Sequence, residues 1–319
     1  MAQIGNDIQI AKQFLETNEV IGIPTETVYG LAANAFNEEA IAKIFEAKNR
    51  PTFDPLIVHT HHINEVIKFV TKIHPKLLAL AEAFWPGPLT LLLPKQNNIP
   101  NLVTSGLERV GVRIPNHPLT LELLKTLSFP LAAPSANPFG YISPTSALHV
   151  EKQLGAKIPY ILDGGFCKVG LESTIVGEEN NEIIIYRLGG LSITDIEAVV
   201  GKVNIELNQS SNPKAPGQLK SHYAPKIPLV IGNLEELEKK YADKKIGALV
   251  FGNYMPFNKN TIVKNLSQHE NYAEAAVNLF NYLREFDEMD LDMIIADYLP
   301  NISLGMAIND RLKRAASEI

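Results

Sequence analysis

Short apolar runs alternate with segments of helical periodicity along most of the chain, a pattern that is typical of α/β proteins. The apolar runs are bounded by polar or turn-forming residues and predict buried strands. In the first two thirds of the sequence these strands are expected at residues 20–23, 56–58, 89–93, 110–114, 131–133, 160–162, 174–176 and 183–186. Helices are expected there at residues 63–70, 76–84, 118–127, 145–154 and 193–200.

A further helix between the first two strands has clear local signals. Asn37 is a good N-cap, and the two glutamates that follow it favour the positive end of a helix dipole. Ile41, Ile44 and Phe45 then fall on one face at helical spacing. The pattern predicts a helix that begins directly after Asn37.

The composition of the sequence changes between residues 208 and 228. This stretch is polar, rich in turn formers and without apolar periodicity. Such a stretch predicts a linker. Strand and helix patterns then alternate again, with strands expected at 229–231, 246–251, 261–263 and 293–296 and helices at 234–242, 270–286 and 304–316. This second unit is Rossmann-like but lacks a G-x-G-x-x-G turn, so its fold alone predicts no dinucleotide site. The predicted domains are residues 1–207 and 229–319, joined by the linker 208–228.

The composition is that of an ordinary globular protein, and the formal net charge is −6. Residues 1–205 and the remaining residues are each net acidic, which argues against a protein that grips nucleic acid mainly by charge. No signal peptide and no apolar run long enough to span a bilayer is visible, so we expect a cytoplasmic protein.

Metal and thiol chemistry find little support. Cys167 is the only cysteine, which excludes an internal disulfide and a cysteine-based zinc site, and no base partner for it is visible. His59 and His61 would share one face of a strand, but no set of nearby cysteines or carboxylates completes a tetrahedral site. Catalytic zinc is therefore not expected.

Hydroxyl-bearing side chains follow the first predicted strand, in the segment Thr25-Glu26-Thr27-Val28-Tyr29-Gly30. Ligands usually bind where strands of α/β sheets end, so this segment is a candidate site. The alternative is a polar loop whose hydroxyl groups cap the next turn.

Lys48 and Arg50 end the capped helix and precede the second strand. Cations are favoured at helix C-termini, so both residues could be exposed and without function. The functional alternative is a phosphate clamp, since arginine offers a planar fork and lysine a point charge.

Further polar groups stand at the ends of later strands. Arg113 is flanked by apolar residues, and burying it without an anion would be costly. Small polar groups follow the strand at 131–133, a serine directly precedes the strand at 174–176, and an arginine directly follows the strand at 183–186. These residues are Ser135, Asn137, Ser143, Ser173 and Arg187.

Together these segments resemble the threonylcarbamoyl-AMP synthase family, whose catalytic domain has the YrdC-like fold. The motifs occur in family order as P-T-E-T-V-Y-G-L, K-x-R-P, P-L-I-V-H, W-P-G-P-L-T, V-R-I-P, A-P-S-A-N, S-x-T-S-A, L-E-S-T-I-V and Y-R-L-G. The resemblance continues through A-P-G-Q-L-K-S-H-Y-A-P in the linker and G-M-A-I-N-D-R-L near the C-terminus. It implies a twisted, mixed-sheet YrdC-like catalytic domain followed by a small Rossmann-like α/β domain.

The resemblance also implies roles for individual residues. Lys48 and Arg50 would be catalytic. The ATP contacts would be Lys48, Arg50, Asp54, Ser135, Asn137, Ser143, Arg187 and Tyr223. The threonine contacts would be Thr27, His59, Arg113, Ala133 and Ser173. Tyr223 would cover the nucleotide, so that the linker acts as a lid. A carboxylate at Asp54 favours a metal over a phosphate, and Arg109 would either contact the nucleotide or point to solvent.

The implied activity is synthesis of threonylcarbamoyl-AMP and pyrophosphate from L-threonine, bicarbonate and ATP. Mg²⁺ would arrive with ATP rather than in a protein-only site, and no organic cofactor is implied. The product would pass to a tRNA threonylcarbamoyl transferase complex that modifies an adenosine next to the anticodon. No membrane partner is expected, and direct tRNA binding is expected to be absent or weak.

Two alternatives remain open. A non-enzymatic RNA-binding protein of the same fold would use the same cations on a phosphate backbone, although the acidic balance disfavours it. A carbamoyl-transfer enzyme that uses carbamoyl phosphate and ATP would need acylphosphatase-like and zinc-finger modules, for which a chain with one cysteine has no room.

Overall fold

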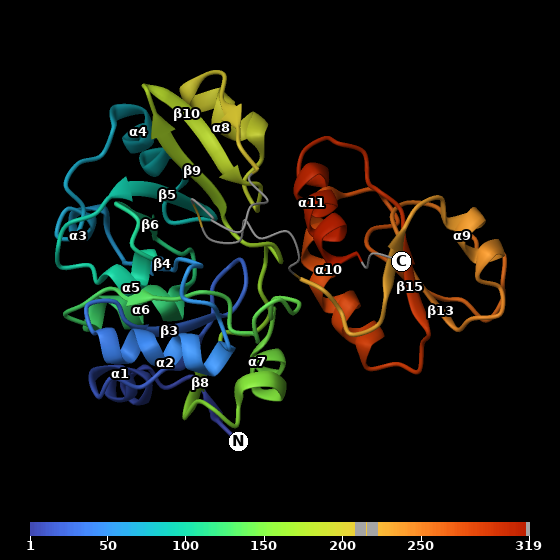
Figure 1. The fold of residues 1–319 in the computed structure, drawn as a ribbon, viewed down its shortest axis with the longest axis horizontal. Coiled ribbons are helices and arrows are strands. Elements are labelled where there is room, and N and C mark those ends of the chain that lie inside the picture. The colour runs from blue at the N-terminus through green and yellow to red at the C-terminus, as the bar shows by residue number, and fades with distance from the viewer. Residues whose placement is uncertain (208–214, 216–222, 317–319) are drawn as a thin grey trace.

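The computed structural model describes residues 1–207, 215 and 223–316. These residues form two lobes (Figure 1). The larger lobe is built on a mixed sheet of eleven described strands and the smaller on a parallel sheet of four. The α/β prediction, with a mixed-sheet domain followed by a small Rossmann-like domain, is confirmed.

The strands of the larger sheet are mostly short, and its order mixes segments from all parts of the first 205 residues. The order is β1-β8-β2-β3-β7-β4-β6-β5-β9-β10-β11, and both parallel and antiparallel neighbours occur. The bounds are β1 (Gln3–Gly5), β2 (Ile21–Ile23), β3 (Gly30–Asn34), β4 (Ile57–His59), β5 (Leu89–Pro94), β6 (Arg109–Arg113), β7 (Leu131–Ala132), β8 (Tyr160–Leu162), β9 (Thr174–Glu179), β10 (Glu182–Arg187) and β11 (Asn204–Ile205).

Helices bury their apolar faces against this sheet. Their bounds are α1 (Ile8–Glu16), α2 (Glu38–Lys48), α3 (Ile63–Val66), α4 (Pro75–Phe84), α5 (Asn101–Thr104), α6 (Pro118–Thr126), α7 (Ala147–Leu154) and α8 (Ile193–Val200). Helices α1 and α6 contact each other, and Ala11, Leu15 and Leu123 join Ile21 and Leu162 of the sheet in one apolar cluster.

Helix α2 forms as predicted. The Asn37 side chain accepts a hydrogen bond from the backbone N–H of Ala40, and Asn49 closes the helix in the left-handed conformation at φ 50°. Ile41, Ile44 and Phe45 are all buried. The local capping and periodicity signals therefore fix both the position of the helix and the point where the chain leaves it towards Arg50.

Three elements near the N-terminus were not predicted, namely β1, α1 and β3. The candidate loop after Ile23 ends at Tyr29, because the chain turns back at Gly30 and β3 pairs antiparallel with β2. The loop between these strands, residues 24–29, is thus held at both ends by the sheet.

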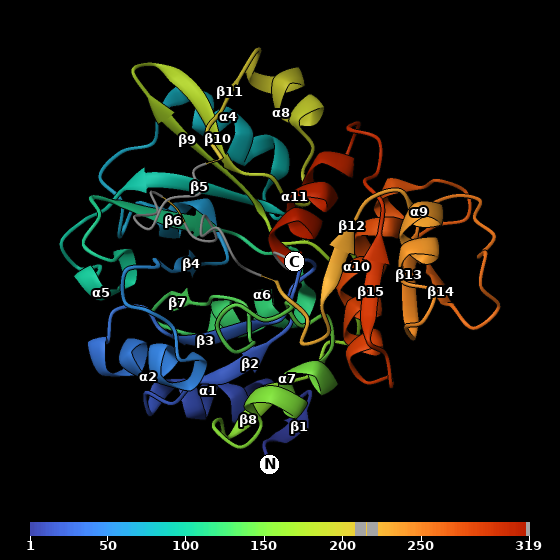
Figure 2. The same cartoon turned by 45° about the vertical axis from the view of Figure 1, so that its right-hand side comes forward.

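The smaller lobe is a parallel sheet in the order β12-β15-β13-β14. Helix α9 covers one face, and α10 and α11 cover the face turned toward the larger lobe (Figure 2). The bounds are β12 (Leu229–Ile231), α9 (Leu234–Lys240), β13 (Ile246–Val250), β14 (Ile262–Asn265), α10 (Tyr272–Asp287), β15 (Met293–Ala296) and α11 (Gly305–Ala315). No helix of the described chain combines the length and apolar character needed to cross a bilayer.

The two lobes contact each other through α10 and α11. The Tyr141 hydroxyl donates to an Asp287 carboxylate oxygen at 2.6 Å, and Arg284 Nε donates to the Ser143 carbonyl oxygen at 3.2 Å. Most of the predicted linker, residues 208–214 and 216–222, lies outside the described residues. Tyr223 beyond it is buried and stacks on Phe280 of α10, with ring centroids 5.6 Å apart.

Candidate active site

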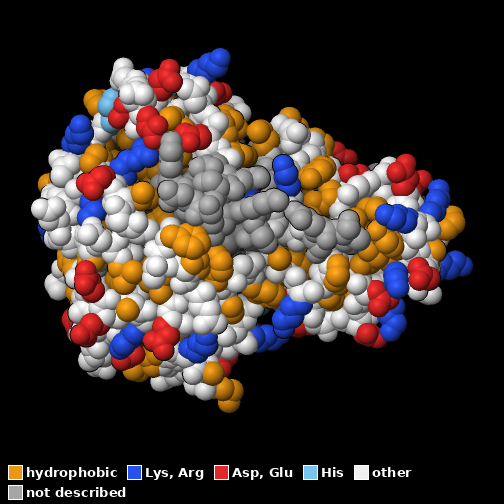
Figure 3. Space-filling view, in the orientation of Figure 1, with side chains coloured by type: hydrophobic (Ala, Val, Ile, Leu, Met, Phe, Trp, Pro, Cys, Tyr) orange, Lys and Arg blue, Asp and Glu red, His pale blue; other side chains and the backbone are white. Residues whose placement is uncertain are grey.

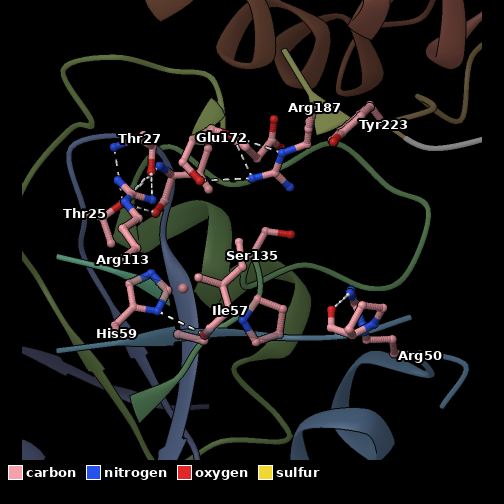
Figure 4. Close-up of a pocket in the computed structure, with 16 residues that line it drawn as sticks. Thr25, Thr27, Arg50, Ile57, His59, Arg113, Ser135, Glu172, Arg187 and Tyr223 are labelled. Carbon is pink, nitrogen blue, oxygen red and sulfur yellow. Dashed lines mark hydrogen bonds between the residues drawn. The ribbon is translucent and has the colours of Figure 1, made fainter. Parts of the chain in front are cut away.

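One cavity on the face of the larger sheet brings most of the predicted site residues together (Figure 4). Its space between atoms is about 580 Å³, part of it open to solvent. Ile57 and His59, two residues apart on β4, both line it, so it lies over one face of that strand. The predicted residues that line it are Thr27, Arg50, His59, Arg113, Ala133, Ser135, Ser173, Arg187 and Tyr223.

At one end of the cavity Arg113 is fixed by the loop between β2 and β3. Its Nη1 donates to the Thr27 hydroxyl at 2.8 Å, and its Nε donates to the Gly87 carbonyl oxygen at 3.2 Å. The anion that a buried arginine needs is provided by Glu26, whose Oε1 lies 2.8 Å from Nη2. Thr25 and Thr27 share a hydrogen bond of 2.8 Å, so the hydroxyl groups form a connected set rather than a solvated loop.

His59 stands beside this set as a neutral imidazole. Burial lowers its pKa from 6.5 to about 3, and the positive charge of Arg113 adds to the effect. Its Nδ1 lies 3.2 Å from the Ile57 carbonyl oxygen. A neutral histidine can accept as well as donate a hydrogen bond, which suits contact with a hydroxyl group.

Ser173 and Arg187 are joined to each other by hydrogen bonds in the cavity wall. The Ser173 hydroxyl is 2.7 Å from the Thr90 hydroxyl, and Arg187 Nη2 donates to it at 3.1 Å. Arg187 also donates to the Ser173 carbonyl oxygen through Nε at 3.0 Å. Burial lowers the pKa of Arg187 to about 10, so the side chain remains a cation at neutral pH.

Arg50 presents a third cation, at the end of the cavity opposite Arg113. Its Nε and Nη2 donate to the carbonyl oxygens of Asp54 and Pro55 at 3.0 and 2.9 Å, and Nη2 lies 2.8 Å from the Asp54 carboxylate. Asp54 is fully buried and does not line the cavity. In this arrangement Asp54 orients Arg50.

Lys48 does not line the cavity either, although it adjoins Arg50 in sequence. Its ammonium is buried and donates to the backbone carbonyl oxygens of Ser135 and Asn137, each at 2.5 Å. Burial lowers its pKa well below the ordinary value. The side chain thereby holds the loop from which Ser135 reaches the cavity, and Asn137 faces the interior of that loop, where its amide donates to Pro138 and Tyr141.

Ser143 likewise lies behind the cavity wall, where its hydroxyl donates to Glu172 at 2.5 Å. Glu172 lines the cavity and Glu26 braces Arg113, yet neither was predicted as a site residue. Both glutamates fall inside motifs that were recognised, one residue before Ser173 and one before Thr27. Their positions, each next to a predicted ligand contact, were the sequence signal that could have identified them.

The side chains of Arg109 and Cys167 lie outside the cavity. Arg109 pairs with Glu179 at 3.0 Å, lies over the Tyr186 ring and does not line the cavity. Cys167 is buried and burial raises its pKa, which leaves it an inert thiol. Among the residues the structure describes, no group of three or more His, Cys, Asp or Glu side chains is placed to hold a metal ion.

Comparisons with known proteins match both lobes. A family model described as "Telomere recombination" (Sua5_yciO_yrdC) matches residues 13–189, and one described as "Threonylcarbamoyl-AMP synthase, C-terminal domain" matches residues 191–317. The threonylcarbamoyl-AMP synthase of Bacillus subtilis (strain 168) is 40% identical over 324 residues, covering 98% of this chain and 94% of that protein. The chain belongs to the threonylcarbamoyl-AMP synthase family.

Solved structures support membership of the two-domain type. The crystal structure of Pyrococcus abyssi Sua5 complexed with L-threonine has a TM-score of 0.91 and 37% identity, covering 97% of this chain and 94% of that one. Escherichia coli YciO, with a TM-score of 0.52 and 19% identity, shares only the fold, over 59% of this chain and 96% of its own. The threonylcarbamoyl-AMP synthase family thus accounts for both lobes, and the resemblance expected from the motifs is confirmed.

Proposed function

We propose that the chain makes threonylcarbamoyl-AMP and pyrophosphate from L-threonine, bicarbonate and ATP. One observation carries the proposal. A single cavity has a hydroxyl-rich end around Thr27, His59 and Arg113 and a cationic end around Arg50 and Arg187. An amino acid and a polyphosphate need different surroundings. This cavity has a part that suits each of them, and the two parts are close together.

The hydroxyl-rich end suits threonine. Arg113 has five N–H groups, of which three face Thr27, Gly87 and Glu26, so donors remain for a carboxylate. Neutral His59 and the hydroxyls of Thr27 and Ser173 would pair with the threonine hydroxyl and carbamate. A valine side chain would leave those polar groups unpaired, which gives a physical basis for discrimination. The relative from Pyrococcus abyssi, solved with L-threonine, supports this assignment.

The cationic end suits the nucleotide. Arg50, Arg187 and Ser135 would contact ATP directly, with Tyr223 covering it. Lys48, Asp54, Asn137 and Ser143 would support those contacts from behind the wall. Mg²⁺ would enter as part of the substrate and neutralise triphosphate charge, since this ion is usually bound largely through substrate phosphates and water.

The chemistry requires alignment more than strong acid–base catalysis. Threonine and bicarbonate condense to an N-carboxylated amino acid with loss of water. An oxygen of this carbamate anion forms a bond to the α-phosphorus of ATP while the bond from that phosphorus to pyrophosphate breaks. The cavity would hold the two anions in line and balance their charge with Arg50, Arg113 and Arg187. Exclusion of water would then protect the mixed anhydride, which hydrolyses readily.

We also infer that the product is passed in the cytoplasm to a tRNA threonylcarbamoyl transferase complex. Direct gripping of RNA is disfavoured, because Lys48, Arg50 and Arg113 are no more than 8% exposed and a polynucleotide backbone cannot reach them. Basic and acidic side chains are also interspersed on the face of the molecule shown in Figure 3, without a large basic patch.

The proposal is tested by incubating the protein with ATP, Mg²⁺, threonine and bicarbonate and detecting the adenylate by mass spectrometry. Pyrophosphate release should require both threonine and bicarbonate. Arg50→Met and Arg113→Met should each abolish it, whereas Arg109→Met, which removes an arginine outside the cavity, should retain it. Product formation without threonine, or equal rates in all four proteins, would exclude the proposed reaction.

A further inference from the structure

Helix α11 of the smaller lobe inserts one arginine into the wall of the cavity. Arg311 is 0% exposed, and its Nε donates to Glu172 Oε2 at 2.9 Å. Its Nη2 donates to the Leu188 carbonyl oxygen at 2.8 Å. Glu172 and Leu188 belong to the larger lobe, so this buried side chain links the two lobes directly at the site.

The same guanidinium contacts the residue proposed to cover the nucleotide. Its central carbon lies 4.9 Å from the centroid of the Tyr223 ring, within the range of a cation–π interaction. The Tyr223 ring also stacks on Phe280, and Arg314 of the same helix lies 5.1 Å from its centroid. Arg311 therefore touches both a wall residue and the cover of the cavity.

Glu172 presents an electrostatic problem for an anionic substrate. It lines the same cavity as Arg50 and Arg187, and its carboxylate would repel a triphosphate if it had no compensating charge. Burial disfavours its ionised form, but Arg311, Arg187 and the Ser143 hydroxyl outweigh burial, and the pKa of Glu172 falls below its ordinary value. Glu172 is thus an anion whose compensation depends in part on the smaller lobe.

Resting on the proposed function, we infer that Arg311 is a positioning residue that makes ATP retention depend on docking of the second domain. When the lobes are docked, Arg311, which also pairs with Asp310 at 2.6 Å, compensates part of the Glu172 charge and contacts Tyr223. When they separate, Glu172 faces the cavity with less compensation and Tyr223 loses a contact. By thermodynamic linkage, ATP binding then stabilises the docked arrangement to the same degree.

A mutant cycle between the two lobes tests this inference in the full-length protein. The dissociation constant for ATP with Mg²⁺ is measured by calorimetry without threonine, so that no turnover is needed. Arg311→Met should weaken ATP binding about 30-fold, roughly 2 kcal/mol. Glu172→Gln should bind ATP at least as tightly as the wild type. The double variant should recover about tenfold of the loss, because the uncompensated carboxylate is gone.

Two further variants separate positioning from a general loss of docking. Arg311→Lys keeps the charge and should weaken binding by less than Arg311→Met. Tyr141→Phe removes the hydroxyl that donates to Asp287 across the same interface without touching Glu172, so Glu172→Gln should give no rescue in that background. Steady-state kinetics of Arg311→Met should show a raised KM for ATP with a smaller change in kcat.

The outcomes are distinct. Independent effects of Arg311→Met and Glu172→Gln, with no rescue, would reduce Arg311 to a structural contact and overturn the inference while wild-type adenylate synthesis upholds the proposed function. Absence of adenylate synthesis in a wild type that binds ATP and shows the rescue would refute the proposed reaction but retain the coupling. A wild type that does not bind ATP would refute both.

Discussion

Replacing Lys48 by methionine should destabilise the larger lobe as well as stop turnover. The Lys48 ammonium is 1% exposed and donates to the carbonyl oxygens of Ser135 and Asn137. Hydrogen bonds from a charged donor contribute about 1.5–3 kcal/mol each, or about 3–6 kcal/mol for two. Relief from burying the ammonium offsets part of this loss, which leaves about 2–4 kcal/mol of destabilisation. The freed loop would also carry Ser135 away from the cavity.

Urea unfolding followed by tryptophan fluorescence measures this effect, since Trp85, the only tryptophan, lies in the larger lobe. Lys43→Met is a matched control on the same helix, because Lys43 is 40% exposed and its ion pair with Glu19 is a surface pair. Such pairs contribute about 0–1 kcal/mol. Equal unfolding free energies for Lys48→Met and Lys43→Met would refute the reasoning, and a folded Lys48→Met protein without turnover would then make Lys48 a direct phosphate contact.

The remaining predictions concern charge and space in the same cavity. His59 has a folded pKa of about 3 against 6.5 unfolded, so the stability it contributes above pH 6.5 is lost as the pH falls toward 3. His59→Gln should therefore reduce the loss of unfolding free energy between pH 7 and pH 5 by about 2 kcal/mol, and an unchanged slope would contradict this. Glu26→Gln leaves Arg113 without its anion and should lower the unfolding free energy in urea by about 3 kcal/mol, so an unaltered midpoint would show the pair to be unimportant. Gly189→Ala places a Cβ 2.3 Å from the Glu172 carbonyl oxygen, so the backbone must shift and kcat/KM should fall about 100-fold, with wild-type kinetics as the contrary result.

Elements with strong local signals were predicted well, and those defined by pairing were not. Helix α2 follows from the cap at Asn37 and its apolar face. Strand β3 consists of Gly-Leu-Ala-Ala-Asn, residues with mostly low strand propensity, and forms because β2 and β7 flank it. Helix α1 could have been predicted, since Asp7 caps it and Ile8, Ala11 and Leu15 share a face.

The prediction of the site was likewise correct where sequence motifs carried the signal and incomplete where the fold decides. Motif resemblance identified nine cavity-lining residues, but it did not separate direct contacts from supports such as Lys48 and Asp54. That distinction depends on which way a side chain leaves the backbone, and the wall in front of Lys48 is made by a loop 87 residues away. Likewise, no local pattern predicts that Arg311 meets Glu172 from 139 residues further along the chain.

The strand order of the larger sheet has a consequence for synthesis on the ribosome. Strand β8 pairs in parallel with both β1 and β2, so the first 23 residues cannot complete their pairing until residues 160–162 have emerged. Until then β2 can pair only with β3, and its other edge remains open to a foreign strand. All the described strands of the smaller lobe come from residues 229–296, so they can pair as soon as this short stretch of chain has emerged. During translation the larger lobe is therefore the one most exposed to misfolding and the one that would gain most from chaperone protection.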